Sequence, residues 1–348
     1  SYRRAVRTLF SEMGNNKEMI FYRLDNAAGT MQYDRMPNRS GNTTNYRGGS
    51  LLGATQEMVD AYFMSNGESP ISGYSADGVT PIINEKSDYV EEGVSTAEYK
   101  GIDGTLYAPV GTRMMYVNRE PRFYASVHYN GRPVLSAITV DDRNYFSSDK
   151  NKDGFGRAEY YYSGSSGAGT QMTDFTGYNV AKKVSTSSSI RNDQAVYRPY
   201  IHIRYAEILL NYMEAMNEYN PEDPKIITYF NEIRERAGIP NITVTYPQDL
   251  GDKEKMREWI LRERQIELAF EGDRFWTLAR RLLYEKEENR KIYRMNVLAD
   301  DQGQGFAFEG FYERKILQTR YWDNKMYLYP IAQTEIDRGR GLVQNPGW

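Results

Sequence analysis

Apolar residues recur at helical spacing in four runs between residues 201 and 282, and this pattern limits the fold more than any other feature. The apolar positions are Ile201, Tyr205, Ile208, Leu209, Tyr212 and Met216; Ile226, Phe230, Ile233 and Ala237; Met256, Trp259, Ile260, Ile266 and Phe270; and Phe275, Leu278, Ala279 and Leu282. Gly238 and Gly272 end the second and third runs. Short connections favour antiparallel helix pairs, as in an α-solenoid, although the tetratricopeptide consensus is not met. The sequence therefore predicts a mainly α fold.

Residues 1–198 have a different character, with many loops and few aliphatic residues. Their patterns predict short helices over 2–13 and 55–66 and an extended run over 18–24. Two apolar runs, 122–129 and 134–140, flank Asn130-Gly131, which accepts the positive φ angles of a type I′ turn, so a β-hairpin is predicted there. We expect a loop-rich part over 1–198 and a helical part over 199–348, within one continuous domain.

Composition excludes several kinds of site. The chain has no cysteine, which excludes disulfides, zinc–thiolate centres and cysteine nucleophiles. It has two histidines, His128 and His202, too few for a three-histidine metal site. A net charge of −3 gives no overall field that would attract nucleic acid, so no nucleic-acid partner is expected.

The chain has 30 tyrosines, whose flat apolar faces and polar tips suit contact with sugars or peptides. Rings in the long loops are the candidate ligand-binding residues, since such loops often carry function. These residues are Tyr74, Tyr145, Phe146, Phe155, Tyr160, Tyr161, Tyr162 and Phe175. Consecutive rings in an extended segment alternate sides, so Tyr160 to Tyr162 cannot all be buried on one face. The alternative, that these rings pack the loops onto the helices, stays open.

Asp149-Lys-Asn151-Lys-Asp153-Gly154 follows the pattern of a calcium-binding loop. Oxygen ligands at alternate positions wrap a hard cation, and the glycine allows a sharp turn. Tyr160 stands where an EF-hand would place its closing acid. Calcium is therefore a possible cofactor at Asp149, Asn151 and Asp153, and an exposed turn is the alternative.

Charged residues interrupt the apolar helical pattern at Arg204 and at Glu267. Buried charges need partners, so we expect these residues to form ion pairs between helices rather than to contact a ligand. Arg122 is expected to have a similar structural role. At the C-terminus, burial of Tyr327, Tyr329, Ile331 and Trp348 is expected to hold the chain end in place.

Several segments, in this order, resemble the SusD/RagB family of nutrient-binding lipoproteins on the outer surface of Bacteroidetes. They begin with Ala54–Gly67 and Asn118–Gly131, the second of which carries an acid followed by proline, arginine and phenylalanine. The others are Gly177–Lys183, Pro199–Ala215, Ile233–Ile239, Arg262–Trp276 and the C-terminal segment Met326–Trp348. Family members also carry a lipidated cysteine and a long N-terminal helical portion, which this chain lacks.

The resemblance implies a SusD-like α-helical fold with tetratricopeptide-like helix pairs, long loops and a small β-hairpin. It further implies a surface protein of the cell outer membrane, attached by a lipid anchor outside this chain. Such a protein captures an oligosaccharide or a peptide and delivers it to a SusC-like TonB-dependent transporter, without catalysis. The alternatives are a structural subunit without its own ligand and a glycoside hydrolase, for which no motif selects the required carboxylate pair.

Overall fold

The computed structural model shows a helix-dominated protein with short antiparallel strand pairs, which confirms the predicted fold class. It describes residues 16–24, 49–102, 104–132, 158–164, 166–169, 175–184, 199–300, 302–339 and 341–348. The helix predicted over residues 2–13 lies outside these ranges. The division of the chain at residue 199 stays a prediction.

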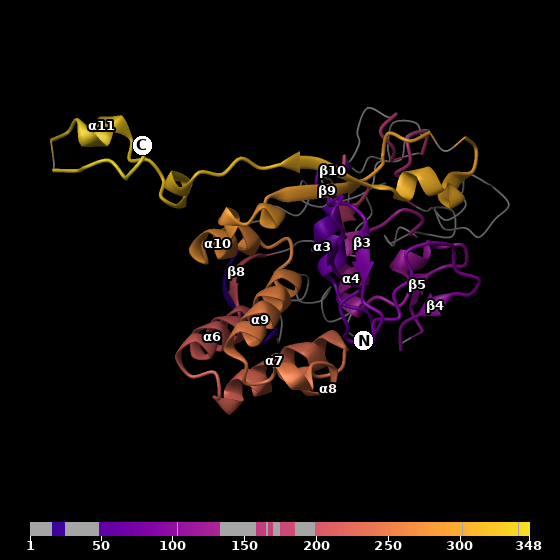
Figure 1. Ribbon diagram of the computed structural model, residues 1–348, viewed down its shortest axis with the longest axis horizontal. Coiled ribbons are helices and arrows are strands. Elements are labelled where there is room, and N and C mark those ends of the chain that lie inside the picture. The colour runs from indigo at the N-terminus through magenta and orange to yellow at the C-terminus, as the bar shows by residue number, and fades with distance from the viewer. Residues whose placement is uncertain are drawn as a thin grey trace.

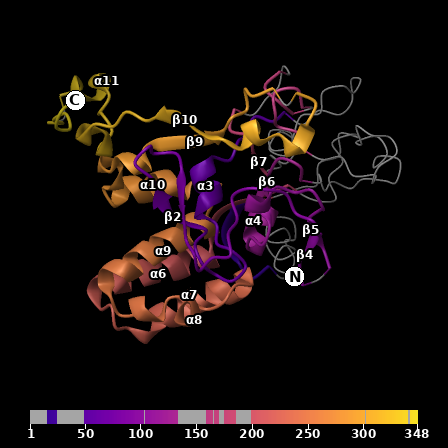
Figure 2. The ribbon, with the colours of Figure 1, turned by 45° about the vertical axis from the view of Figure 1, so that its right-hand side comes forward.

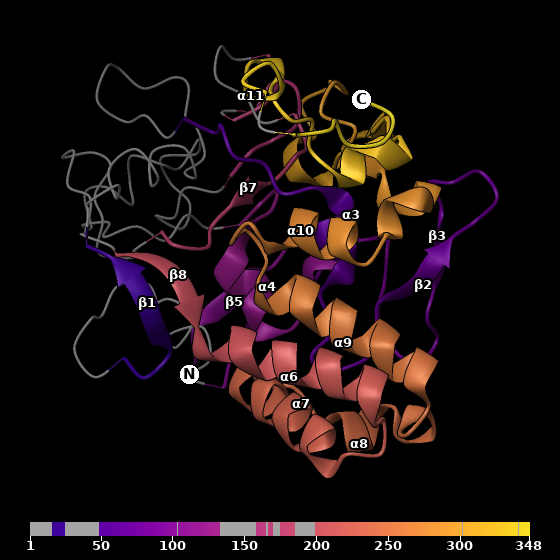
Figure 3. The ribbon, with the colours of Figure 1, turned by 90° about the vertical axis from the view of Figure 1, so that its left-hand side faces the viewer.

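A layer of helices forms one side of the molecule (Figure 3). It comprises α6 (Tyr205–Tyr219), α7 (Pro224–Ala237), α8 (Ile242–Thr245), α9 (Lys253–Glu267) and α10 (Asp273–Arg280). Helix α6 lies between α7 and α9 and contacts both. The apolar positions of the periodic pattern meet in this layer's core, which includes Leu209, Leu210, Met213, Ile226, Phe230, Ile233, Met256 and Ile260.

Capping residues set the ends of these helices. Asp223 accepts a hydrogen bond from the backbone N–H of Lys225 at the start of α7, and Asp252 accepts from Glu254 and Lys255 at the start of α9. Helix α7 ends at Gly238, whose φ of 77° is the left-handed conformation that glycine adopts most easily. The predicted second helix is therefore confirmed, and the third begins as predicted but ends at Glu267 rather than at Gly272.

The first predicted helix begins later than its pattern suggested. Residues Tyr200–Arg204 form strand β8, which pairs antiparallel with β1 (Met19–Arg23), and α6 starts at Tyr205. The backbone N–H of Tyr205 donates to the carbonyl of Glu18 at 2.8 Å. The helical prediction for residues 201–204 was wrong because a distant strand supplies their hydrogen-bond partners, while the extended run predicted over 18–24 is confirmed.

Helix α3 (Gln56–Ala61) is shorter than the helix predicted over residues 55–66. The chain continues through buried Phe63 and Met64 to Gly67, whose φ is +83°. The carbonyl of Gly67 accepts a hydrogen bond from Arg234 Nη2 at 3.0 Å, and a Cβ on Gly67 would lie 2.5 Å from that atom. Gly67 is therefore required for the close approach of Arg234, not as a helix stop.

The hairpin predicted around Asn130-Gly131 was wrong. Residues Pro121–Ser126 form helix α4, with Pro121 at its first turn, and β6 (Val127–His128) pairs with β7 (Asn179–Val180). The turn itself is present, since Arg132 N–H donates to the Tyr129 carbonyl at 3.0 Å, but residues 133–157 lie outside the described residues. Hairpins occur elsewhere, between β2 (Ile71–Tyr74) and β3 (Pro81–Ile83) and between β4 (Tyr99–Lys100) and β5 (Leu106–Ala108).

Tyrosine rings fill much of the second core, around α3 and α4. Tyr116 and Tyr129 stack with their ring centroids 4.5 Å apart, and Tyr107 and Tyr124 do the same. The hydroxyls of Tyr116 and Tyr178 lie 2.9 Å apart. Such rings contribute large buried areas while their hydroxyls find polar partners, so part of the chain's tyrosine content is structural.

The C-terminal residues extend away from the body as an arm (Figures 1 and 2). The arm follows the ribbon of β9 (Lys291–Met295) and β10 (Arg314–Thr319) and carries α11 (Gln333–Ile336). Tyr329 is 64% and Trp348 44% exposed, so the predicted burial of these two residues was wrong. Hydrogen bonds hold the chain end instead, because the Trp348 indole N–H donates to the carbonyls of Lys325 and Leu328 at 2.9 and 2.8 Å.

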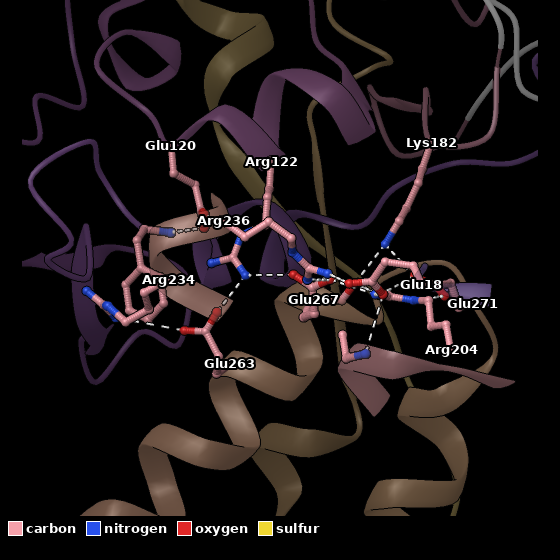
Figure 4. Close-up of polar contacts among 12 residues, drawn as sticks. Glu18, Glu120, Arg122, Lys182, Arg204, Arg234, Arg236, Glu263, Glu267 and Glu271 are labelled. Atoms are coloured by element: carbon pink, nitrogen blue, oxygen red, sulfur yellow. Dashed lines mark hydrogen bonds and ion pairs between the residues drawn. The ribbon is translucent and has the colours of Figure 1, made fainter. Parts of the chain in front are cut away.

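A buried ion-pair network lies between the two cores (Figure 4). Arg122 from α4 contacts Glu120 at 2.6 Å, Glu263 at 2.5 Å and Glu267 at 3.1 Å. Arg204 from β8 contacts Glu267 and Glu271, each at 2.8 Å. These contacts confirm the prediction that Arg122, Arg204 and Glu267 form ion pairs between elements.

Further cations complete this network. Lys182 Nζ lies 2.7 Å from Glu271, and Arg236 from α7 contacts both Glu18 and Glu267. Burial raises the pKa of Glu271, but the charges of Arg204 and Lys182 outweigh burial and lower it to about 2. The network therefore joins β1, α4, β8, α7 and α9 through carboxylates that stay ionised.

Candidate functional site

Two loops and the segment that follows β9 form one surface at the end of the molecule away from α11 (Figure 1). We call it the loop surface, and it comprises the described parts of residues 158–178 and 296–312. Tyr162 N–H donates to the carbonyl of Ala299 at 3.2 Å, and Met295 N–H donates to the carbonyl of Thr176 at 3.0 Å. The two loops are therefore fixed to positions only four residues apart along one segment.

The Gly/Ser-rich stretch after Tyr162 folds back over the preceding residues. Ser166 N–H donates to the Glu159 carbonyl at 2.8 Å, and Gly169 N–H donates to the Tyr162 carbonyl at 2.9 Å. A Cβ on Gly167 would lie 1.8 Å from the Tyr161 carbonyl oxygen, so only glycine fits there. The composition of this stretch is explained by close contact between backbone segments.

Two of the candidate rings reach solvent on the loop surface. Tyr162 is 44% and Phe175 is 60% exposed. Each is held close to residues 295–299, Tyr162 by its own N–H and Phe175 through the neighbouring Thr176. Exposed flat rings on fixed backbone are suited to stacking on a sugar ring or flanking a peptide.

The adjacent candidates support this surface from beneath. Tyr160 is fully buried, and its hydroxyl donates to Asn179 Oδ1 at 2.8 Å. Tyr161 is 8% exposed and meets Phe306 edge to face with ring centroids 5.9 Å apart. The three consecutive tyrosines thus differ in burial, as expected for side chains that alternate sides.

Tyr74 lies in β2, outside the loop surface. Its ring stacks on Tyr293 at a centroid distance of 4.6 Å, and its hydroxyl donates to Asp60 Oδ2 at 2.8 Å. Burial and the Asp60 carboxylate raise the pKa of Tyr74 above its usual range. One ring face and the hydroxyl are therefore engaged within the protein.

The remaining candidates lie outside the described residues. They are Tyr145, Phe146 and Phe155 among the rings, and Asp149, Asn151 and Asp153 at the calcium-loop pattern. Within the described parts of the chain, no three acidic or histidine side chains are grouped so that they could hold a metal ion. Calcium binding at 149–154 stays a prediction from the sequence.

A thermal unfolding assay tests the calcium prediction. Calcium is expected to raise the melting temperature of the unsubstituted chain, because binding to the folded state alone stabilises it. The double substitution Asp149→Ala and Asp153→Ala is expected to abolish this shift. Magnesium serves as the control cation, and a calcium-dependent shift that survives the double substitution would sink the assignment.

Sequence reasoning missed the polar side chains that border the exposed rings. Residues 300–309 carry exposed side chains that offer hydrogen bonds, namely Asp300, Gln302, Gln304 and Glu309. Glu309 pairs with buried Arg113 at 2.5 Å, and the guanidinium of Arg113 lies 4.7 Å from the ring centroid of Tyr312. Burial raises the pKa of Tyr312 to about 12. The mixture of Gly, Gln, Asp and Phe in this segment was the available signal, but it has no regular spacing.

The described helices include none with the length and apolar character needed to cross a bilayer.

The comparisons with known proteins agree with the fold. A model of the SusD family matches residues 17–348. The SusD-like protein P2 of Formosa agariphila is 29% identical over 153 residues, which are 43% of this chain and 26% of that protein. The crystal structure of a SusD-like protein from Bacteroides fragilis superimposes with a TM-score of 0.68 and 25% identity, over 99% of this chain and 57% of the other.

A second Bacteroides fragilis structure, described as a SusD-like carbohydrate binding protein, superimposes with a TM-score of 0.58 at 21% identity. The match covers 95% of this chain and 56% of that one. The chain thus spans little more than half the length of the solved relatives that it matches. Because the family match extends from residue 17 to residue 348, the chain belongs to the SusD family.

Proposed function

We propose that this protein binds a nutrient at the cell surface and delivers it to a SusC-like TonB-dependent transporter of the outer membrane. The observation that carries the proposal is the family match over residues 17–348. An oligosaccharide is the favoured ligand, since one structural neighbour is described as carbohydrate binding, and a peptide is the alternative. The outer-membrane location and a lipid anchor outside this chain are parts of the same proposal.

The loop surface is the proposed ligand site. Tyr162 and Phe175 offer exposed ring faces, and the neighbouring carboxylates and amides of residues 300–309 offer hydrogen bonds to hydroxyl groups. This combination of a few flat rings with polar groups around them is the usual chemistry of sugar recognition. The site is proposed to bind without cleaving, and chromatography of the bound oligosaccharide after long incubation would reveal any product.

Replacing the exposed rings is expected to weaken ligand binding. A panel of oligosaccharides and peptides is first screened by isothermal titration calorimetry, and the tightest binder is used. Tyr162→Ala and Phe175→Ala are each expected to weaken binding about 10-fold, because a ring contact contributes roughly 0.5–1.5 kcal/mol beyond its buried area. The melting temperature of each variant shows whether folding is preserved.

Tyr219→Ala is the matched control, since Tyr219 is 86% exposed but lies on α6, in the helical layer. Its affinity is expected to equal that of the unsubstituted protein. Equal affinity in all three variants would remove the loop surface as the ligand site. No binding to any member of the panel would favour the alternative of a structural subunit without a ligand.

Delivery to a transporter is tested on protein extracted from its native membrane in mild detergent. Mass spectrometry of the complex is expected to show a large β-barrel partner together with a bound small molecule. A bound oligosaccharide supports the favoured ligand, while a series of peptides reverses that choice and keeps the transport role. Extraction of the protein alone, with neither barrel nor ligand, would contradict the transport proposal.

A further inference from the structure

Three buried polar atoms around Glu263 have no hydrogen-bond partner within the protein. They are Arg122 Nη2, Arg234 Nη1 and Glu263 Oε2. The three side chains are almost fully buried, at 3%, 0% and 0% exposed. A buried charged group that lacks a partner costs about 1–3 kcal/mol or more, so such atoms in a native protein call for one.

The position of Arg234 is fixed by its other contacts. Its Nε donates to the Pro240 carbonyl at 2.6 Å and its Nη2 donates to the Gly67 carbonyl at 3.0 Å. The guanidinium also lies over the ring of Phe63, 4.8 Å from the centroid. Moving Arg234 toward Glu263 would weaken these contacts.

Glu263 is held in a similar way from the other side. Its Oε1 lies 2.5 Å from Arg122 Nη1, while its Oε2 lies 3.8 Å from Arg234 Nη1. The second distance exceeds that of a hydrogen bond. Figure 4 shows the Glu263 carboxylate between the two arginines, joined to both by dashed lines. The two nitrogen atoms and the oxygen therefore border one small region where α4, α7 and α9 meet.

We propose that this junction is a binding site for a single buried water molecule. The water accepts hydrogen bonds from Arg122 Nη2 and Arg234 Nη1 and donates one to Glu263 Oε2. Three hydrogen bonds are the usual number for an internal water. Two N–H donors disfavour a cation at this position and the carboxylate disfavours an anion, whereas water offers both an acceptor and a donor.

A high-resolution crystal structure of the unsubstituted chain tests the site directly. The expected result is a single density peak within hydrogen-bond distance of all three atoms, with a low displacement parameter. A direct hydrogen bond between Arg234 Nη1 and Glu263 Oε2, with no density peak beside them, would overturn the proposal. This measurement does not depend on any variant folding correctly.

Oxygen-17 magnetic relaxation dispersion provides a second test, since it counts long-lived internal waters in solution. Arg234→Met keeps a long apolar side chain against Phe63 but lacks Nη1, and is expected to hold one long-lived water fewer. Arg257→Met is the control, because Arg257 lies on the same helix as Glu263 but is 31% exposed and pairs with Glu218. An unchanged count in a folded Arg234→Met variant would also overturn the proposal.

Discussion

Glu267→Gln is expected to lower the free energy of unfolding by about 3–5 kcal/mol, the usual loss when one partner of a buried ion pair is removed. Glu267 contacts Arg122, Arg204 and Arg236, of which the first two are only 3% and 2% exposed. Glutamine keeps the shape of the side chain but leaves these charges without compensation. Urea-induced unfolding monitored by circular dichroism measures the difference.

Glu218→Gln is the matched control for this prediction. Glu218 also contacts three cations, Arg257, Arg281 and Lys253, but it is 29% exposed and its partners are 23% to 43% exposed. Solvent screens such a cluster, so a loss of about 0–1 kcal/mol is expected. Equal losses in the two variants would show that burial does not strengthen the contacts of Glu267. The proposed nutrient binding, by contrast, should persist in folded Glu267→Gln.

Stability is expected to fall by about 3 kcal/mol through Glu271 alone as the pH drops from about 5 to about 2. The pKa of Glu271 is 4.5 in the unfolded reference and about 2 in the folded protein, because Arg204 and Lys182 outweigh the effect of burial. The unfolded state therefore binds the proton first as the pH falls. The stabilisation is fully present above pH 4.5 and is lost between pH 4.5 and pH 2.

Urea unfolding at a series of pH values tests this prediction, with Glu271→Gln as the comparison. The substituted protein is expected to be less stable at pH 7 and to lose less stability on acidification. Glu120 acts in the opposite sense, since burial raises its pKa even beside Arg122, and the stability it contributes is lost as the pH rises. Glu120 is retained in both proteins, so a parallel pH dependence of the two would refute the role given to Glu271.

Local signals predicted the helices well where the chain supplies its own partners. Asp252 and Gly238 mark helix ends through contacts within a few residues, and the structure places both as the sequence indicates. The strand Tyr200–Arg204 was mistaken for helix because its partner, β1, lies about 180 residues earlier. The hairpin at Asn130-Gly131 failed for the same reason, since β6 pairs with β7 instead of the next segment.

The candidate site was predictable in kind but not in detail. Aromatic content and long loops indicated a ring-based surface, and two of the rings, Tyr162 and Phe175, are exposed. Sequence could not separate Tyr162 from Tyr160, because their burial depends on a fold-back by Gly167 and on hydrogen bonds from Asn130 and to Asn179. The ion-pair residues were predictable as partners of something, but their actual partners are set by tertiary packing.

The ion-pair network joins parts of the chain that are far apart in sequence. Arg122 precedes Glu263 and Glu267 by 141 and 145 residues, and Glu18 precedes Arg236 by 218. Closing such long loops costs chain entropy before any contact forms, so we expect these pairs to assemble late in folding. Substitutions in the network should then raise the unfolding rate and leave the folding rate nearly unchanged. The buried charges would thereby set the lifetime of the native state more than the speed at which it is reached.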